Sequence, residues 1–350
     1  MEEAKKLVIN IVTWNSARYL RDLFASMDTQ TTKDFSVSIV DNASADETLV
    51  WLQEHRSEVA LLRNFRNQGF ARAHNQGIAM ALSRWERLGD LARRYILLLN
   101  PDTVLDATCI AQLISYMDTH PEVAIAGPKL LRAIRPLTED GEPGDVERTR
   151  TIDSTGIQLM KRRVFLDRGA GEEDGGQYDH EEPFGISGAA MLLRASAITD
   201  LEIQDRMLFD EEYFAYKEDV DLCWRARLLG RQIALVPTAL AWHFRTAKPH
   251  DQKGLWGKFK GQRSRSGFVN YLSRRNQIWT EWKNDDVVNR FMHLLWRIPQ
   301  RILRLGSCVF PSHLRAVIDA WRGRGRMQEK RKQLHARRKR TPDEMRAHIR

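Results

Sequence analysis

Apolar and polar positions in the first half of the chain follow two alternating patterns. Short apolar runs rich in β-favouring residues occur at Lys6–Trp14, Phe35–Asn42 and Tyr95–Leu99. Segments between them repeat their apolar residues every three or four positions, as in Ser16–Met27, which is typical of a helix with one buried face. This strand–helix alternation predicts an α/β fold in which a mostly parallel sheet carries helices on both faces.

Polar residues stand where several of these strands end. Open parallel sheets bind their ligands outside the carboxyl ends of the strands, so these side chains are the first candidates for a functional site. The residues in question are Thr13, Trp14, Asn15, Asp41, Asn42, Asn67, Asn100 and Asp102.

Two of these strand ends suggest contacts to a nucleotide. A carboxylate at Asp41 can accept the N3–H of uracil or thymine, although an Asp-Asn pair also favours an ordinary turn. Asn67 and Asn75 can donate to ribose or phosphate near a helix N-terminus, which attracts anions, and Gly69 permits close backbone approach. Simple capping of the helix by Asn67 is the alternative explanation.

Asn100 and Asp102, which follow an apolar run, are candidates for binding a metal ion. Their side-chain oxygens lie two residues apart, and Pro101 stiffens the turn between them. Mg²⁺ and Mn²⁺ prefer oxygen ligands, and such an ion can neutralise a diphosphate leaving group. The sequence therefore predicts metal binding by Asp102, with Asn100 on the donor side, against the alternative of a plain Asn-Pro turn.

Composition and charge narrow the class of protein. The 350 residues contain three cysteines without a CxxC pair, which indicates neither a disulfide framework nor a zinc cluster. We find no signal peptide and no uncharged apolar run of about 18 residues, the length that spans a bilayer. The net charge of +9 is matched by residues 321–350 alone, where twelve Lys and Arg face three Asp and Glu.

The basic C-terminal region predicts contact with a membrane surface. The segment Phe291–Phe310 mixes Phe, Leu, Ile and Trp with Arg around Pro299, as interfacial helices do. The Lys and Arg residues at 322–340 would be attracted to anionic lipid by roughly 1 kcal/mol per charge. A soluble helical appendage or a homodimer contact would explain the same pattern. We expect no nucleic-acid binding, because no aromatic stacking module accompanies the charge.

Five segments together resemble family-2 glycosyltransferases, which have the GT-A fold, and they occur in that family's order. The resemblance covers about residues 6–245, continues weakly to Arg274–Trp279, and is greatest in detail to bacterial rhamnosyltransferases that build surface polysaccharides. The segments are VTWNSARYLRDLFASM, IVDNASADET, NFRNQGFARAHNQGI, LLNPDTVL and FDEEYFAYKEDVDLCWRARLLG.

The resemblance implies a domain organisation and an activity. A GT-A domain would occupy 1–247, with a nucleotide-binding half to about 127 and an acceptor-side half over 128–247. A mainly helical basic extension would follow over 248–350. The implied reaction is inverting transfer of a sugar, most plausibly L-rhamnose, from dTDP-rhamnose or a UDP-sugar. The acceptor would be a lipid-linked or polysaccharide sugar at the inner face of the plasma membrane.

The resemblance also implies roles for individual residues. The family has a metal-binding DxD where this chain has Asn-Pro-Asp, so Asn100 is a departure that removes one negative charge. An inverting transfer needs a general base, although acids at a helix start are also stabilised by the helix dipole alone. The implied assignments are Asp219 as base, Glu218 as its orienting or acceptor-binding partner, His243 completing the metal site, and Gly188 and Arg275 on the acceptor side.

We also predict the environment of two neighbouring residues and consider two alternative functions. We expect Asp221 to face solvent and Trp242 to lie in the core. A sugar-nucleotide nucleotidyltransferase would need a Gly-rich, Lys- or Arg-bearing loop after the first strand, and none is present there. A non-catalytic scaffold of the same fold is disfavoured by the intact acidic residues and the histidine.

Overall fold

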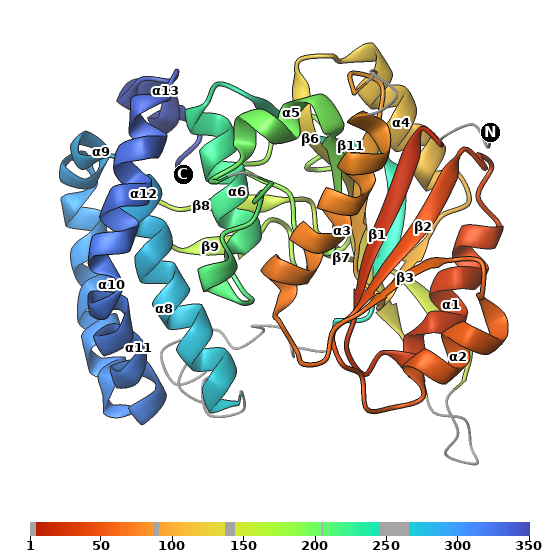
Figure 1. The fold of residues 1–350 in the computed structure, drawn as a ribbon. Coiled ribbons are helices and arrows are strands. Elements are labelled where there is room, and N and C mark those ends of the chain that lie inside the picture. The colour runs from red at the N-terminus through yellow and green to blue at the C-terminus, as the bar shows by residue number, and fades with distance from the viewer. Residues whose placement is uncertain (1–4, 87–90, 137–143, 205, 246–265) are drawn as a thin grey trace.

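A mixed nine-stranded sheet forms the centre of the computed structural model, which describes residues 5–86, 91–136, 144–204, 206–245 and 266–350 (Figure 1). In spatial order its strands are β3 (Ala60–Arg63), β2 (Phe35–Asp41), β1 (Leu7–Thr13), β4 (Tyr95–Leu99), β10 (Ala190–Arg194), β6 (Val123–Ile134), β11 (Gln232–His243) and β5 (Thr103–Leu105), with β7 (Glu147–Ser154) paired to β6. A separate two-stranded sheet joins β8 (Ile157–Leu159) and β9 (Phe165–Asp167).

The two halves of the large sheet differ in strand direction. β3, β2, β1 and β4 run parallel, as the apolar runs predicted. β10 is antiparallel to both β4 and β6, while β11 is parallel to β6 and antiparallel to β5. Because β10 runs against β4, the loop before β10 lies beside the carboxyl end of β4. This placement brings the segment 185–189 to the edge at which β1, β2 and β4 end.

Helices cover both faces of this sheet. One face packs against α1 (Ala17–Asp28), α2 (Thr48–His55) and α4 (Cys109–Thr119), and the other packs against α3 (Phe70–Glu86), α5 (Ala195–Leu201) and α6 (Glu218–Leu228). Strand β4 serves both cores, because Leu97 and Leu99 point to one cluster and Ile96 and Leu98 to the other. Alternate side chains of a strand point to opposite faces, so a strand buried on both sides has to be apolar throughout.

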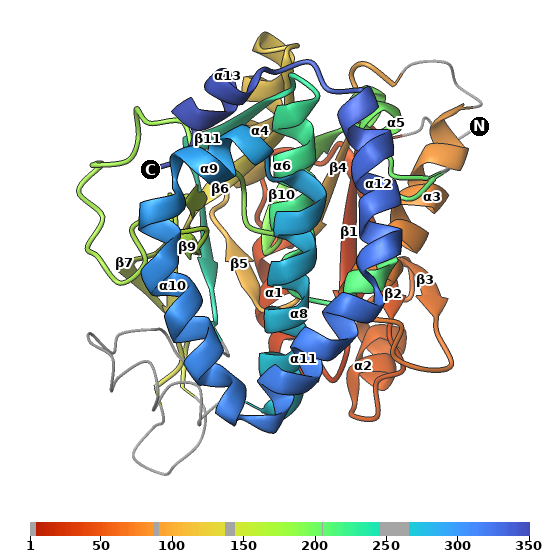
Figure 2. The ribbon, with the colours of Figure 1, turned by 90° about the vertical axis from the view of Figure 1, so that its left-hand side faces the viewer.

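The C-terminal region is helical and packs on the sheet domain. Its elements are α8 (Gly267–Asn284), α9 (Val287–Met292), α10 (Leu294–Gly306), α11 (Pro311–Arg322), α12 (Arg324–Ala336) and α13 (Pro342–Ala347), with short 3₁₀ turns η1 (Glu211–Tyr213) and η2 (Ser307–Val309). Helix α8 lies next to α6, with α10 to α12 beyond it (Figures 1 and 2). Leu334, Met345 and Ile349 belong to the same apolar cluster as α6, so this region shares the core of the preceding domain.

The charges of this region are partly neutralised by the domain on which it packs. Lys330 of α12 lies 2.7 Å from Asp210, and Arg326 lies 2.7 Å from Glu212. These cations therefore attract an anionic surface less than the sequence count alone indicates. Among the residues that the structure describes, no helix is both long and apolar enough to cross a bilayer.

Candidate active site

The ends of β1 and β2 form a buried hydrogen-bonded pair. Thr13 and Asp41 are register partners, and the Thr13 hydroxyl donates to Oδ1 of Asp41 at 2.9 Å. The Ser44 hydroxyl and N–H also donate to this carboxylate, at 2.6 and 3.0 Å. Asn15 joins the same loops, because its side-chain oxygen accepts from the Ala45 N–H at 2.7 Å. The predicted nucleotide residues of these two strands therefore lie together at the carboxyl edge.

The loop after β3 is attached to this edge through Asn42. Its side-chain nitrogen donates to the Gly69 carbonyl at 3.1 Å. Asn67 accepts from the N–H of the same glycine at 2.8 Å, which forms a turn just before α3 begins at Phe70. Gly69 has a φ of +84°, and a Cβ there would lie 2.5 Å from the carbonyl oxygen of Phe214. Only glycine fits this position, which places the donor-side helix against the segment that precedes α6.

Asn75 makes contacts of a different kind. Its amide bonds the Phe209 backbone in both directions, at 2.8 and 2.9 Å, and also donates to Glu211 at 3.2 Å. The side chain is 4% exposed. These contacts support a structural role for Asn75 in place of the predicted contact with a nucleotide. The side chain connects α3 to the segment that leads into η1.

A histidine and two carboxylates meet where β5 and β11 pair. His243 is the register partner of Thr103, and its Nε2 lies 3.2 Å from Oδ1 of Asp102. Its Nδ1 lies 2.9 Å from Oδ2 of Asp153 in β7. Burial alone would lower the pKa of His243, but the two carboxylates outweigh burial and raise the pKa to about 10. Trp242, on the opposite face of the strand, is in the core as expected.

Asp153 and Arg245 are site residues that the sequence analysis missed. Arg245 Nε lies 3.2 Å from Oδ1 of Asp153, and its guanidinium also pairs with Asp167. Asp153 lies 90 residues from His243 in the sequence. Its one local signal is a carboxylate at the buried end of a strand, and this signal does not identify the histidine as its partner.

The chemistry of this corner fits a divalent cation. Asp102 would supply an oxygen, and His243 would supply Nε2 once that nitrogen gives up the proton that it shares with Asp102. Asp153 would hold Nδ1 and so orient the ring, as outer partners of metal-bound histidines do. Mg²⁺ sites commonly use one or two carboxylates, with phosphate and water completing the sphere. In the described parts of the chain, no three His, Cys, Asp or Glu side chains converge as a full metal site.

The acidic pair at the start of α6 lies in two different environments. Oδ2 of Asp219 accepts from the Gly188 N–H at 3.1 Å and Oδ1 accepts from the Val220 N–H at 2.7 Å. Burial raises the pKa of Asp219. Glu218 is 7% exposed, and its Oε2 has no hydrogen-bond partner among the described residues. Burial, followed by the nearby Asp219, raises the pKa of Glu218 well above its usual range.

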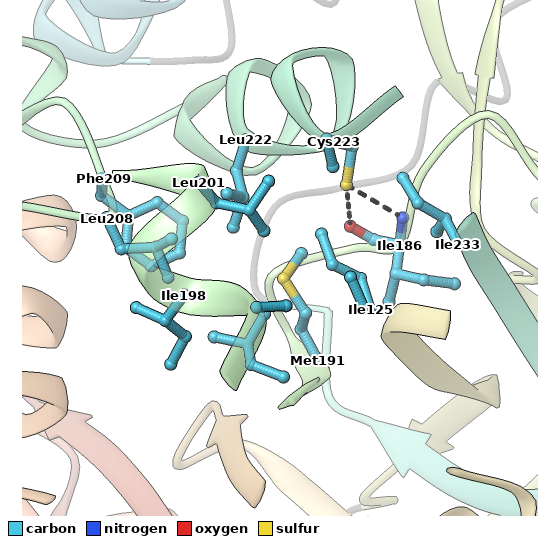
Figure 3. Close-up of a cluster of buried hydrophobic side chains, with 14 of the residues drawn as sticks. Ile125, Ile186, Met191, Ile198, Leu201, Leu208, Phe209, Leu222, Cys223 and Ile233 are labelled. Carbon is cyan, nitrogen blue, oxygen red and sulfur yellow. Dashed lines mark hydrogen bonds between the residues drawn. The ribbon is translucent and has the colours of Figure 1, made fainter. Parts of the chain in front are cut away.

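The loop that contains Gly188 is held against α6 by a cysteine. Cys223 Sγ accepts from the Ile186 N–H at 3.4 Å and donates to the Ile186 carbonyl at 3.7 Å, at the edge of a buried apolar cluster (Figure 3). Further along the loop, the Ala189 carbonyl accepts from the Asn100 N–H at 2.9 Å. One short segment therefore connects Asp219 with the turn that contains Asn100 and Asp102.

A strained segment immediately before the acidic pair is held by α8. Phe214, Tyr216 and Lys217 have φ values of 64°, 72° and 74°, which cost about 1–3 kcal/mol each for residues other than glycine. Asn276 donates to the carbonyls of Tyr213, Ala215 and Tyr216 at 2.8–2.9 Å.

Arg275 also contacts this segment. Its guanidinium donates to the Glu212 carbonyl at 2.8 Å and lies over the Trp279 ring at 4.3 Å. The geometry therefore supports a role for Arg275 in positioning the backbone before α6 in place of the predicted acceptor contact.

The expectation that Asp221 faces solvent is wrong. Its side chain is 0% exposed and lies 3.0 Å from Arg225 and 2.9 Å from Lys283. The reason is that α8 packs on this face of α6, an arrangement that the local sequence does not encode.

Comparison with known proteins identifies the family of this chain. The model of glycosyl transferase family 2 matches residues 8–198. An N-acetylglucosaminyl-diphospho-decaprenol L-rhamnosyltransferase of Mycobacterium tuberculosis is 26% identical over 330 residues, covering 91% of this chain and 96% of its own. A poly-beta-1,6-N-acetyl-D-glucosamine synthase of Staphylococcus aureus is 22% identical over 260 residues, covering 73% and 53%.

A solved structure extends the comparison to the fold. S. aureus TarS 1-349 in complex with UDP-GlcNAc matches with a TM-score of 0.50 and 14% identity, covering 95% of this chain and 90% of that one. The predicted α/β architecture is confirmed. The chain belongs to glycosyl transferase family 2 and has the GT-A fold.

Proposed function

We propose that this glycosyltransferase is inverting and moves L-rhamnose from a nucleoside-diphosphate donor to a lipid-linked acceptor sugar. One observation carries the mechanism: Asp219 is hydrogen-bonded to Gly188 in the loop that also bonds Asn100, beside Asp102 and His243. The name of the mycobacterial relative supports both rhamnose and an acceptor that carries N-acetylglucosamine on a lipid diphosphate.

In this proposal Asp219 acts as the general base. The acceptor hydroxyl oxygen forms a bond to the anomeric carbon while the bond from that carbon to the diphosphate breaks. The bonding pair leaves with the nucleoside diphosphate, and the hydroxyl proton passes to the carboxylate of Asp219. The hydrogen bonds from Gly188 and Val220 hold this carboxylate in place. Glu218, buried beside it with a raised pKa, is suited to orient the acceptor hydroxyl.

The donor end is assigned to the edge formed by β1, β2 and the start of α3. Thr13, Asp41 and Asn42 would contact base and ribose, and the N-terminal turn of α3 at Gly69 would lie near phosphate. Asp102 and Nε2 of His243 would hold Mg²⁺ or Mn²⁺, and a bound ion would stabilise the charge of the leaving diphosphate. Asn100 would contribute a neutral oxygen on the donor side of this ion.

The proposal is tested by direct transfer assays with purified protein and a short-chain lipid-diphosphate-N-acetylglucosamine acceptor. We expect product with dTDP-rhamnose and Mn²⁺ or Mg²⁺, little product with UDP-N-acetylglucosamine, and none in EDTA. Product formed with UDP-N-acetylglucosamine but not with dTDP-rhamnose would overturn the rhamnose assignment. Full activity in EDTA would overturn the metal assignment and leave the base assignment intact.

A further inference from the structure

Helix α10 turns two of its three arginines, Arg297 and Arg304, toward the protein. Arg297 is 6% exposed and lies 3.1 Å from Glu281 and 3.0 Å from Asp285. Arg304, two turns further along, lies 2.6 Å from Glu281. A surface helix of a soluble protein normally places its apolar stripe on the core and its charges in water. Here the arrangement is reversed.

The apolar side chains of α10 and its neighbours consequently point outward. Leu295 is 81% exposed, Leu305 is 70% exposed and Phe291 of α9 is 75% exposed. Trp296, Ile302 and Val309 are also more than half exposed, and Figure 2 shows α10 at the surface of the molecule. We call these six residues the α10 face. Contiguous exposed apolar surface of this kind marks a site that contacts another apolar phase or partner.

The charges around the α10 face identify what covers it. No Asp or Glu occurs between Val287 and Ile318, and Arg301 is exposed, while Arg315 pairs with Asp319 at 3.7 Å just beyond this stretch. A second copy docked by two-fold symmetry would bring Arg301 near its own equivalent, with no acid from this stretch to neutralise it. An anionic lipid surface supplies both the apolar phase and the negative charge.

A groove beside the α10 face adds cationic groups at its edge. It has a volume of about 530 Å³, and its walls include Met292, Trp296, Lys161 and Arg346. Lys161 Nζ lies 5.6 Å from the centre of the Trp296 ring, and Arg346 pairs with Asp343 of the same wall at 2.6 Å. An aromatic ring beside a lysine is suited to the level of the phosphate groups of a bilayer.

We propose that the α10 face docks on the surface of an anionic bilayer, with its apolar side chains inserted among the headgroups. Docking through apolar insertion differs from attraction by the basic residues at 322–340, because insertion resists salt while the attraction of exposed charges is screened. The proposal concerns a surface, so it does not depend on which sugar the enzyme transfers.

The test is flotation of the full chain with vesicles of phosphatidylcholine containing roughly 30% phosphatidylglycerol, which gives the vesicles a negative surface. The variant Leu295→Glu with Ile302→Glu should float at least about tenfold less, since each substitution removes an exposed apolar side chain that would insert into the bilayer and adds a negative charge. Val50→Glu, at an exposed apolar residue of α2 that is 52% exposed, is the matched control and should float like the wild type.

Light scattering and thermal melting separate the outcomes. Equal melting temperatures would show that the double variant is folded. Reduced flotation of that variant alone, persisting at high salt, supports the docking site. Unchanged flotation of the double variant would overturn it. The proposal would also be overturned if the wild type were a dimer that does not float and the double variant were a monomer. The α10 face would then contact a second copy.

Discussion

Lys283 of α8 places its ammonium nitrogen 2.9 Å from Oδ2 of Asp221 in α6 and 2.7 Å from Asp210. Lys283 and Asp221 are 1% and 0% exposed at the side chain. Burial alone would raise the pKa of Asp210, but Lys283 and Lys330 outweigh it and lower the pKa below its usual range. The helical C-terminal region therefore supplies counter-charges to the helix that begins with the proposed base.

Replacement of Lys283 should destabilise the whole protein. Lys283→Met leaves two buried carboxylates without this cation, which typically costs about 3–5 kcal/mol. Urea denaturation should show a midpoint well below that of the wild type. Lys332→Met on the exposed side of α12 is the matched control and should change little. Equal midpoints for the two variants would show that α8 does not support α6 electrostatically.

Loss of the Asn276 amide should reduce turnover more than substrate binding. Asn276→Ala removes three hydrogen bonds to carbonyls of the strained segment before α6, and a misplacement of about 1 Å in a catalytic group can cost about a hundredfold. We expect kcat to fall by this order with KM for the donor nearly unchanged. Gln333→Ala, at an exposed amide of α12, should keep full kcat. An increase in KM with unchanged kcat would contradict the positioning role.

Asp219→Asn should abolish most transfer and preserve donor binding. Loss of a general base typically lowers the rate by about 10²–10⁴-fold, and donor affinity can be measured by calorimetry. Because burial raises the pKa of Asp219, wild-type kcat/KM should fall with decreasing pH from a point above the ordinary aspartate range. Turnover at the wild-type level in this variant would remove Asp219 from the mechanism.

Glu218→Gln should stabilise the fold, increasingly so as the pH rises. The pKa of Glu218 is raised in the folded state, so the folded state holds its proton more tightly than the unfolded state, and stability is lost as pH rises through the folded pKa. Glutamine removes this penalty. Melting temperatures at roughly pH 5 and pH 8.5, both above the ordinary glutamate pKa, should show the larger gain at the higher pH. A gain in melting temperature confined to the lower pH would contradict a raised pKa of Glu218 in the folded state.

Asp153→Asn should weaken metal binding without eliminating it. Outer partners of metal-bound histidines commonly contribute about 10–100-fold in affinity, and Asp153 is the residue that holds Nδ1 of His243. Mn²⁺ titration in the presence of nucleoside diphosphate should show this loss, while Asp102→Ala should lose binding altogether. Glu147→Gln, at the exposed start of β7, is the control. Equal affinity in Asp153→Asn and wild type would exclude the outer role.

Much of the nucleotide-side architecture is predictable from local patterns. The five-residue apolar run Tyr95–Leu99 becomes a strand buried on both faces, and Thr13 and Asp41 end neighbouring parallel strands. Parallel strands that enter one sheet have their carboxyl ends at one edge, so residues at those ends converge without detailed knowledge of packing. For the same reason the sequence predicts that Asp102, which follows β4, lies at this edge.

Other parts of the site depend on contacts between distant segments. Asn75 lies on the predicted helix, yet its amide donates to the backbone carbonyl of Phe209, 134 residues away. Arg275 was expected to meet an acceptor phosphate, and its guanidinium instead bonds the backbone before α6. A motif identifies which residue types are present, but it does not identify which of several polar partners the tertiary structure places within reach.

The sequence by itself determined the α/β class, the family resemblance and the candidate edge, because periodicity and strand-end chemistry are local properties of the chain. Only the tertiary structure decided that Asp153 lies against His243, that Asp221 is buried against Lys283, and that α10 turns Arg297 and Arg304 inward. An amphipathic pattern specifies two faces of a helix. Which face contacts the protein depends on where buried counter-charges such as Glu281 lie, and that is decided by packing across the whole fold.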